Sequence, residues 1–145
     1  DQRHLIDPAG EPAWSPLGDY VAVSSYTNAP PPQLYLVSAD ASNLGRLIEG
    51  GSPTWSPDGQ RLIFIDSAGG RHGPSFSMVN VDGSGLTFLT TSPLLRPSRP
   101  VFSPDGRQVA FVSERDGFGI DIMNVEGNEP TRITDETGFY GYLDW

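Results

Sequence analysis

Trp55-Ser56-Pro57-Asp58-Gly59 is a pattern that this 145-residue chain contains three times. It recurs as Trp14-Ser15-Pro16-Leu17-Gly18 and as Phe102-Ser103-Pro104-Asp105-Gly106, and a further aromatic residue, Trp145, stands at the matching phase. Successive aromatic residues are 41, 47 and 43 residues apart. A sequence period of about 40–45 residues is typical of the four-stranded blade of a β-propeller. The pattern therefore predicts a chain built from three such blades.

The residues around each repeat predict its strands and turns. Proline and glycine in Ser-Pro-x-Gly favour a tight turn, because proline presets φ and glycine accepts a positive φ. A nearly continuous apolar run follows, which is typical of a strand covered on both faces. These runs are Tyr20–Val23, Leu62–Ile65 and Val109–Val112. An alternating strand, a turn such as Asp82-Gly83 and a short outer strand complete each unit, and helical periodicity is absent. We predict an all-β chain of antiparallel blades.

The aromatic residue of each unit is the expected contact between neighbouring blades. A large aromatic side chain buries roughly 150–250 Å² of surface. We therefore predict that the blade cores are anchored by Trp14, Trp55, Phe102 and Trp145.

The repeats also divide the chain. We expect an outer strand of a preceding or exchanged blade at residues 1–10, blades at 11–50, 51–91 and 92–136, and the start of a following blade at 137–145. Propellers close with about four to eight blades, so three form an incomplete ring. Either the chain is part of a longer propeller, or it self-associates, as two chains in a six-bladed ring or as a polymer that exchanges terminal strands.

Composition and motifs narrow the classes of function. A formal net charge of −9 argues against nucleic acid as a partner. No apolar run is long enough for membrane insertion. The chain has no cysteine and two histidines, His4 and His72, so we expect no metal site and no cofactor. A Gly-x-Ser-x-Gly nucleophile motif is also absent, and we predict that the chain is not an enzyme.

The repeat resembles that of the TolB-type (WD40-like) β-propellers. The likeness rests on Pro-x-Trp-Ser-Pro-Asp-Gly at residues 53–59, the apolar strand after it, and Asn80-Val81-Asp82-Gly83. The first unit departs from the pattern at Leu17 and Ala41, where the repeat has Asp and Gly. The resemblance implies a propeller and a periplasmic or extracellular location in bacteria. Similar repeats occur in TolB and in the propeller domains of prolyl-oligopeptidase-like and tricorn-type peptidases.

Loops of variable length mark the expected binding face. The connections between the second and third strands, and between blades, differ in length among units and emerge on one face of a propeller. Loops on a rigid scaffold commonly carry binding residues, and arginine and aromatic residues are favoured at interaction sites. The candidate binding residues on this face are Tyr26, Arg71, His72, Arg96, Arg99, Arg115, Phe118 and Tyr140. This concentration of arginine in an acidic chain suggests an acidic peptide or a carboxylate as ligand.

These observations favour a non-enzymatic interaction scaffold of the bacterial envelope that binds protein or peptide through the variable-loop face. Two alternatives remain open. The chain is a structural subunit of a self-assembling propeller polymer, or it is the propeller fragment of a larger prolyl-oligopeptidase-like peptidase.

Overall fold

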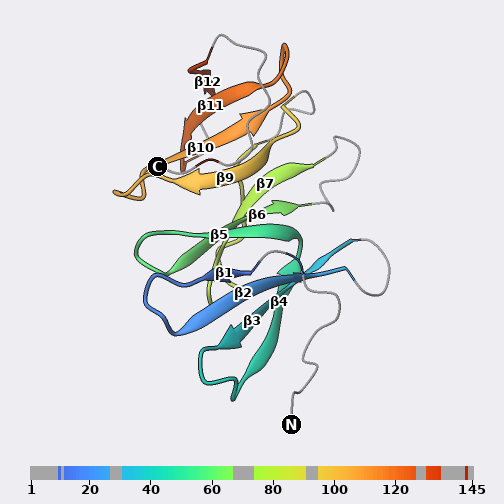
Figure 1. Ribbon diagram of the computed structural model, residues 1–145, viewed down its shortest axis with the longest axis vertical. Helices are drawn as coiled ribbons and strands as arrows, with labels where there is room; N and C mark the ends of the chain where they lie inside the picture. Colours follow the sequence, from blue (N-terminus) through green and yellow to red (C-terminus); the bar gives the residue numbers. More distant parts are fainter. Residues whose placement is uncertain are drawn as a thin grey trace.

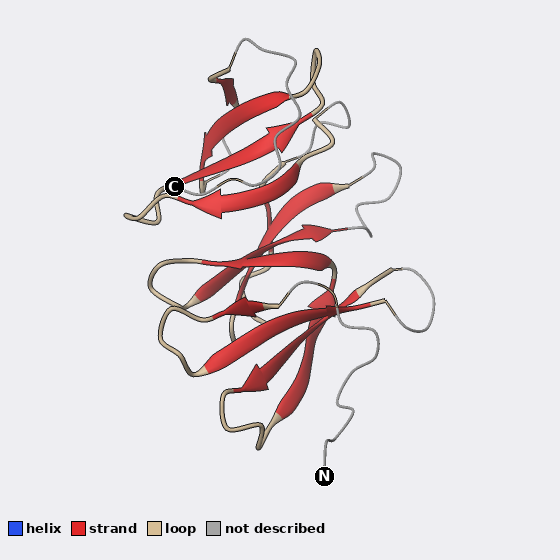
Figure 2. Cartoon of the chain, viewed as in Figure 1, coloured by secondary structure: helices blue, strands red, loops and turns tan. Residues whose placement is uncertain are grey.

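The chain forms twelve β-strands and no helix in the residues that the structure, a computed structural model, describes: 10, 12–26, 31–66, 74–90, 95–126, 130–134 and 143 (Figure 2). The strands make three four-stranded antiparallel sheets, each built from four consecutive strands. These sheets are blades 1, 2 and 3, and they are stacked in chain order along the long axis of the molecule (Figure 1). The predictions of an all-β fold and of three four-stranded propeller blades are confirmed.

Within each blade the strand order follows the chain. Blade 1 contains β1 (Ala13–Trp14), β2 (Tyr20–Ser25), β3 (Gln33–Ser38) and β4 (Leu44–Glu49). Blade 2 contains β5 (Gly51–Trp55), β6 (Arg61–Asp66), β7 (Ser75–Asn80) and β8 (Thr87–Phe88). Blade 3 contains β9 (Ser98–Phe102), β10 (Gln108–Ser113), β11 (Gly119–Asn124) and β12 (Thr131–Arg132). The strands expected at 1–9 and at 137–145, Leu143 aside, lie outside the described residues.

The Ser-Pro-x-Gly turns connect the first two strands of each blade. In blade 2 the Ser56 hydroxyl donates to the Asp58 carboxylate at 2.6 Å, so the side chains brace the turn. Blade 1 has Leu17 at the aspartate position, and the Ser15 hydroxyl donates instead to Asp19 at 2.6 Å. The turn is therefore maintained in the unit that departs from the repeat.

Four exposed or nearly exposed turn carboxylates have pKa values below the ordinary value. We call them the turn aspartates: Asp40, Asp58, Asp82 and Asp105. In each case the largest cause is a hydrogen bond from a neighbouring serine hydroxyl, which stabilises the charged form. The bonds from Ser38 and Ser42 lower the pKa of Asp40 to about 2. These aspartates act as turn residues.

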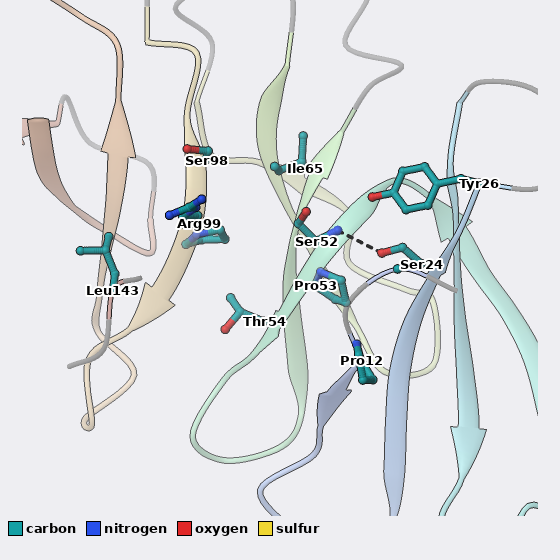
Figure 3. A pocket seen from close by; sticks show the side chains of 12 residues that line it. Pro12, Ser24, Tyr26, Ser52, Pro53, Thr54, Ile65, Ser98, Arg99 and Leu143 are labelled. Atoms are coloured by element: carbon teal, nitrogen blue, oxygen red, sulfur yellow. Dashed lines mark hydrogen bonds between the residues drawn. The ribbon is translucent and has the colours of Figure 1, made fainter. Parts of the chain in front are cut away.

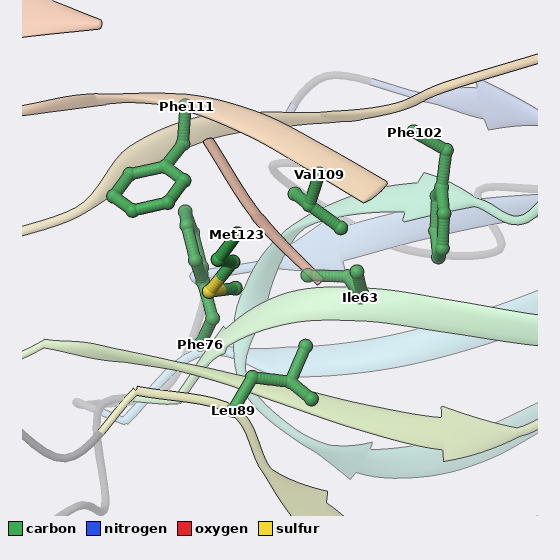
Figure 4. Close-up of a cluster of buried hydrophobic side chains, with 7 residues drawn as sticks. All are labelled: Ile63, Phe76, Leu89, Phe102, Val109, Phe111 and Met123. Atoms are coloured by element: carbon green, nitrogen blue, oxygen red, sulfur yellow. The ribbon is translucent and has the colours of Figure 1, made fainter. Parts of the chain in front are cut away.

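The hydrophobic core lies between the blades in two clusters. Between blades 1 and 2, Ala22 and Leu34 pack with Trp55, Leu62, Phe64 and Val79. Between blades 2 and 3, Ile63, Phe76 and Leu89 pack with Phe102, Val109, Phe111 and Met123 (Figure 4). Consecutive residues of β6 thus enter different clusters, which explains why its sequence is continuously apolar.

The aromatic residues of the repeat occupy two different environments. Trp55 is 8% exposed, and its indole Nε1 donates a hydrogen bond of 2.8 Å to the carbonyl oxygen of Ala13. Phe102 is also buried, whereas Trp14 is 62% exposed, and Trp145 lies outside the described residues. The prediction that Trp14 anchors the core is wrong for this chain. Trp55 and Phe102 pack toward the preceding blade, and no described blade precedes blade 1.

Candidate functional site

A cavity of about 590 Å³ opens where the first strands of the three blades begin (Figure 3). Its walls come from the residues at the start of β1, β5 and β9, from the ends of β2 and β6, and from Leu143. The lining residues are Gly10, Pro12, Ser24, Tyr26, Ser52, Pro53, Thr54, Ile65, Ser98, Arg99, Pro100 and Leu143. The cavity therefore joins all three blades at one end.

Equivalent positions of the repeat build this wall. Ser52 and Arg99 each precede the aromatic residue of their unit by three positions, and a proline follows each of them. Both have positive φ values, 51° and 54°, and both lie in register shifts of their strands that have the form of a β-bulge. Blades 2 and 3 thus share one backbone geometry at the cavity but present different side chains.

The Tyr26 ring lies close to the backbone at Gly10, which precedes β1, and at Gly51, the first residue of β5. A Cβ atom at Gly10 would lie 2.8 Å from the Tyr26 ring, and one at Gly51 would lie 3.1 Å from the phenol oxygen. These two glycines therefore allow the close approach of the ring. Ser24 connects neighbouring parts of the wall through two hydrogen bonds. The Ser24 hydroxyl accepts a hydrogen bond of 3.1 Å from the backbone N–H of Ser52, and the Ser24 carbonyl oxygen accepts one of 2.5 Å from the backbone N–H of Gly10.

The chemistry of the wall is that of a binding site for a polar ligand with an apolar part. Arg99 is the single charged residue among the described residues that line the cavity. Hydroxyl groups come from Ser24, Tyr26, Ser52, Thr54 and Ser98, and three prolines and Ile65 supply apolar surface. Guanidinium and hydroxyl groups bind anionic and carbonyl oxygens, while proline and tyrosine contact apolar groups.

The structure places the candidate binding residues in different surroundings. Tyr26 and Arg99 line the same cavity, and the Tyr26 side chain is 53% exposed. The remaining described candidates, Arg96, Arg115 and Phe118, do not line it. Arg71, His72 and Tyr140 lie outside the described residues.

Two of the arginines outside the cavity make ion pairs within blade 3. Arg96 is exposed and lies 3.3 Å from the Glu114 carboxylate. Arg115 lies 3.6 Å from the fully buried carboxylate of Asp121 and donates to the carbonyl oxygen of Pro130 at 3.3 Å. These contacts connect the loop between β10 and β11 to other parts of blade 3.

Blade 3 contains a buried network of charged and hydroxyl side chains. Asp121 is fully buried, and it accepts hydrogen bonds of 2.6 Å from Arg132 Nε and of 2.6 Å from the Ser113 hydroxyl. Arg132 also donates to Ser113 at 3.1 Å. Sequence reasoning did not identify this network, although an aspartate between the two isoleucines of β11 was a usable signal.

Sequence reasoning also missed the hydroxyl residues of the cavity. Ser24, Ser52, Thr54 and Ser98 are dispersed along the chain, among many other serines and threonines. The signal that could have found Ser52 is its position directly before the repeated proline, which Arg99 shares.

Comparison with known proteins agrees with this architecture. No family model matches the chain. Among solved structures, a protein described as TolB from Agrobacterium tumefaciens superposes with a TM-score of 0.78, at 24% identity over 88% of this chain and 50% of its own. TolB from Acinetobacter baumannii gives a TM-score of 0.73 and 22% identity, over 88% of this chain and 32% of its own. The fold is that of a TolB-like β-propeller.

Other similarities to this propeller come from peptidases and from a second Agrobacterium protein. The propeller domain of the Trilobed protease from Pyrococcus furiosus superposes with a TM-score of 0.65, at 13% identity over 88% of this chain and 43% of its own. In sequence, the chain is 31% identical to protein Atu1656 of Agrobacterium fabrum over 137 residues, which are 90% of this chain and 44% of that protein. It is 30% identical over 105 residues to peptidase YuxL of Bacillus subtilis, covering 69% of this chain and 16% of the peptidase. The chain thus spans less than half the length of these curated relatives.

The described residues contain no helix with the length and hydrophobicity that a membrane crossing needs. They also contain no cluster of three histidine, aspartate or glutamate side chains placed to hold a metal ion.

Proposed function

We propose that this propeller is a non-enzymatic binding scaffold of the bacterial envelope and that it holds a protein or peptide segment in the cavity at the start of β1, β5 and β9. The cavity is the observation that supports the proposal. Its volume of about 590 Å³ suits a bound segment, since ligand sites usually measure roughly 300–1,000 Å³. The envelope location is supported by the likeness to TolB and by bacterial relatives.

The arrangement of the wall favours binding of an extended segment. Tyr26 packs against the backbone at Gly10 and Gly51 on one side and is 53% exposed, so part of its ring is open to contact a ligand. Three prolines make part of the apolar wall rigid, because their φ angles are already fixed. A preformed surface of this kind binds with a smaller ordering cost than a flexible one.

A peptide library displayed on phage tests the proposal directly. We expect selection on the immobilised chain to enrich peptides, and we expect Tyr26→Ala to weaken the enriched peptides about tenfold or more, as at a typical aromatic hot spot. Phe88→Ala is the matched control, because Phe88 is 57% exposed, close to the 53% of Tyr26, and does not line the cavity. Failure to enrich any peptide, or equal binding by the Tyr26→Ala variant, would contradict the proposal.

Self-assembly is a second candidate function, and the exposed Trp14 favours it. Residues Trp14, Val21, Val23 and Val37 repeat the positions of Trp55, Leu62, Phe64 and Val79, which pack against the neighbouring blade. Among these blade 1 residues Trp14 is 62% exposed, Val21 and Val37 are half-buried and Val23 is buried, so Trp14 is the part of this surface that another blade could contact. A sizing column coupled to light scattering tests this candidate, since a monomer of 15.7 kDa at all concentrations would exclude it.

The similarity to YuxL supports a third candidate, in which the chain is the propeller of a larger peptidase. The cavity would then receive peptide substrates on their way to a separate catalytic domain. Sequencing the complete reading frame tests this candidate, which requires a hydrolase domain with a Gly-x-Ser-x-Gly motif in the same polypeptide.

A further inference from the structure

Four hydroxyl groups in the cavity wall are available to a ligand. They belong to Tyr26, Ser52, Thr54 and Ser98, whose side chains Figure 3 shows around the cavity. Among the described residues, none forms a hydrogen bond with the hydroxyl group of any of these four. Ser24 differs from them, because its hydroxyl already accepts a hydrogen bond from the backbone N–H of Ser52. The wall thus offers a ligand neutral hydrogen-bonding groups from residues of all three blades.

Two of these hydroxyls stand at repeat positions where the other blades have none. Thr54 directly precedes the aromatic residue of its unit, and the same register position holds Ala13 in blade 1 and Val101 in blade 3. Ser98 precedes its aromatic residue by four positions, and a glycine stands there in the other two units. The blade architecture therefore does not require either hydroxyl.

The first strands are poorly suited to extend their sheets into the cavity. β1, β5 and β9 are edge strands, and an edge strand normally offers unpaired N–H and C=O groups to a peptide strand. Each of them has a proline that lines the cavity, within the strand or directly before it, and proline has no N–H to offer. Register shifts in β5 and β9 interrupt the regular edge further. This geometry favours binding of a peptide by side chains instead of by strand addition.

The side chains left for recognition are neutral. Arg99, the one charged residue among the described lining residues, already has an interaction partner of its own. A hydroxyl group donates its hydrogen to a carbonyl oxygen, and every residue of a peptide, proline included, carries such an acceptor. The backbone carbonyl is therefore the ligand group that this wall fits.

We infer that the cavity binds backbone carbonyl groups of its peptide ligand through the hydroxyls of Thr54 and Ser98, without strand addition. The two residues come from β5 and β9, so two neighbouring blades each supply a donor to one bound segment. The exposed part of the Tyr26 ring offers an apolar contact to the same segment. The ligand is thus selected by its backbone and an apolar side chain, and not by a charge. The inference rests on the proposed function, because it names the groups through which the peptide is held.

Two tripeptide probes separate this mode of binding from strand addition. They are N-acetyl-Phe-Ala-Ala-amide and its analogue in which both alanines are N-methylated, which keeps every carbonyl group and lacks both alanine N–H groups. An added strand uses the N–H groups of alternate residues, so methylation of two consecutive residues blocks it in either register. Each probe is titrated at millimolar concentration into the ¹⁵N-labelled chain, and the amide signals of Ser52, Thr54 and Ser98 are followed by NMR. We expect the two dissociation constants to agree within about twofold, because the carbonyl acceptors are unchanged.

Two variants connect the binding to the hydroxyl groups. Thr54→Val and Ser98→Ala each remove one hydroxyl, and valine already occupies the position equivalent to Thr54 in blade 3. We expect each variant to bind both probes about three- to tenfold more weakly, as the loss of one neutral hydrogen bond implies. Thr131→Val is the matched control, because Thr131 is an exposed strand residue that does not line the cavity. The urea unfolding midpoint of each variant reports whether the fold is maintained.

The outcomes are distinct. Weaker binding by Thr54→Val and by Ser98→Ala, together with retained binding of the N-methylated probe, supports the inference. Unchanged binding in either variant, or loss of binding when the probe is N-methylated, would overturn the inference and leave the proposed function intact. If neither probe shifts these signals, the carbonyl inference is wrong, and the phage selection separately decides whether the cavity binds peptides at all.

Discussion

Replacing Trp14 and Trp55 separately by alanine compares one position of the repeat in two environments. Both residues stand directly before a Ser-Pro-x-Gly turn, yet Trp14 is 62% exposed and Trp55 is 8% exposed. Trp55 packs with residues of blade 1 and donates its indole hydrogen bond to Ala13. We expect Trp55→Ala to reduce the free energy of unfolding far more than Trp14→Ala.

The exposed fractions give the expected size of the difference. If a tryptophan side chain offers roughly 200 Å² of surface, roughly 180 Å² is buried at Trp55 and roughly 80 Å² at Trp14. At about 25 cal/mol per Å², these areas correspond to about 4.5 and about 2 kcal/mol. The lost indole hydrogen bond adds about 1 kcal/mol at Trp55, so the two variants should differ by about 3.5 kcal/mol.

Urea unfolding followed by far-UV circular dichroism, at several protein concentrations, measures both variants. Trp55→Phe serves as an intermediate control, because it keeps most of the ring contact and removes only the indole donor, at an expected cost of about 1 kcal/mol. An equal loss of stability in Trp14→Ala and Trp55→Ala would refute the reasoning, since it would mean that the Trp14 surface is covered in solution. A midpoint that rises with protein concentration would then identify a second copy of the chain as the covering surface.

Three further predictions concern the turns, the buried network and the packing between blades. Because their pKa values are lowered in the folded state, the turn aspartates stabilise the fold at pH values above the aspartate pKa of the unfolded chain, which is near 4. This contribution to stability should be lost as the pH falls through the lowered pKa values of the folded state. Replacing all four turn aspartates by asparagine should therefore flatten the decline of the urea unfolding midpoint between pH 5 and about pH 2. Arg132→Met leaves the buried Asp121 carboxylate without its nearest cation, so urea unfolding should show a loss of about 3–5 kcal/mol that a second change, Asp121→Leu, largely restores. Gly50→Ala would place a Cβ atom 2.3 Å from the Phe64 ring at a φ of 151°. We expect this variant to lose about 1–3 kcal/mol of unfolding free energy, measured by thermal unfolding. Gly45→Ala is the control that should change little, because nothing lies within 4 Å of its Cβ position.

The local features of the fold could be predicted because the residues that specify them are neighbours in the chain. Ser56, Pro57, Asp58 and Gly59 close a turn within a few residues, and the hydrogen bonds of that turn depend on no distant partner. The continuous apolar run of β6 likewise indicates a strand between two layers, because Leu62, Ile63 and Phe64 alternate between two faces. The repetition of these signals then predicts the number of blades.

The candidate site could be predicted only in part. Tyr26 and Arg99 are 73 positions apart, and their meeting at one cavity depends on the stacking of blade 1, blade 2 and blade 3. Arg115 was an equally reasonable candidate from its loop position, but it lies outside the cavity and its guanidinium is 3.6 Å from the buried carboxylate of Asp121, a contact that its sequence neighbours do not predict. The glycines next to Tyr26, Gly10 before β1 and Gly51 in β5, are distant in the sequence, so their proximity to the ring appears only in three dimensions.

The repeat, the strands, the turns and the all-β blade architecture follow from the amino-acid sequence, because each of these depends on short-range backbone preferences and on alternation along a strand. Which copy of a repeated residue is buried, and which side chains share the cavity, depends on how the blades pack against one another. Trp14 and Trp55 belong to the same motif, and one is exposed while the other is buried, because burial depends on whether a neighbouring blade is present. In the same way, Ser52 and Arg99 have similar backbone conformations, and they line one cavity because the first strands of the three blades begin at the same end.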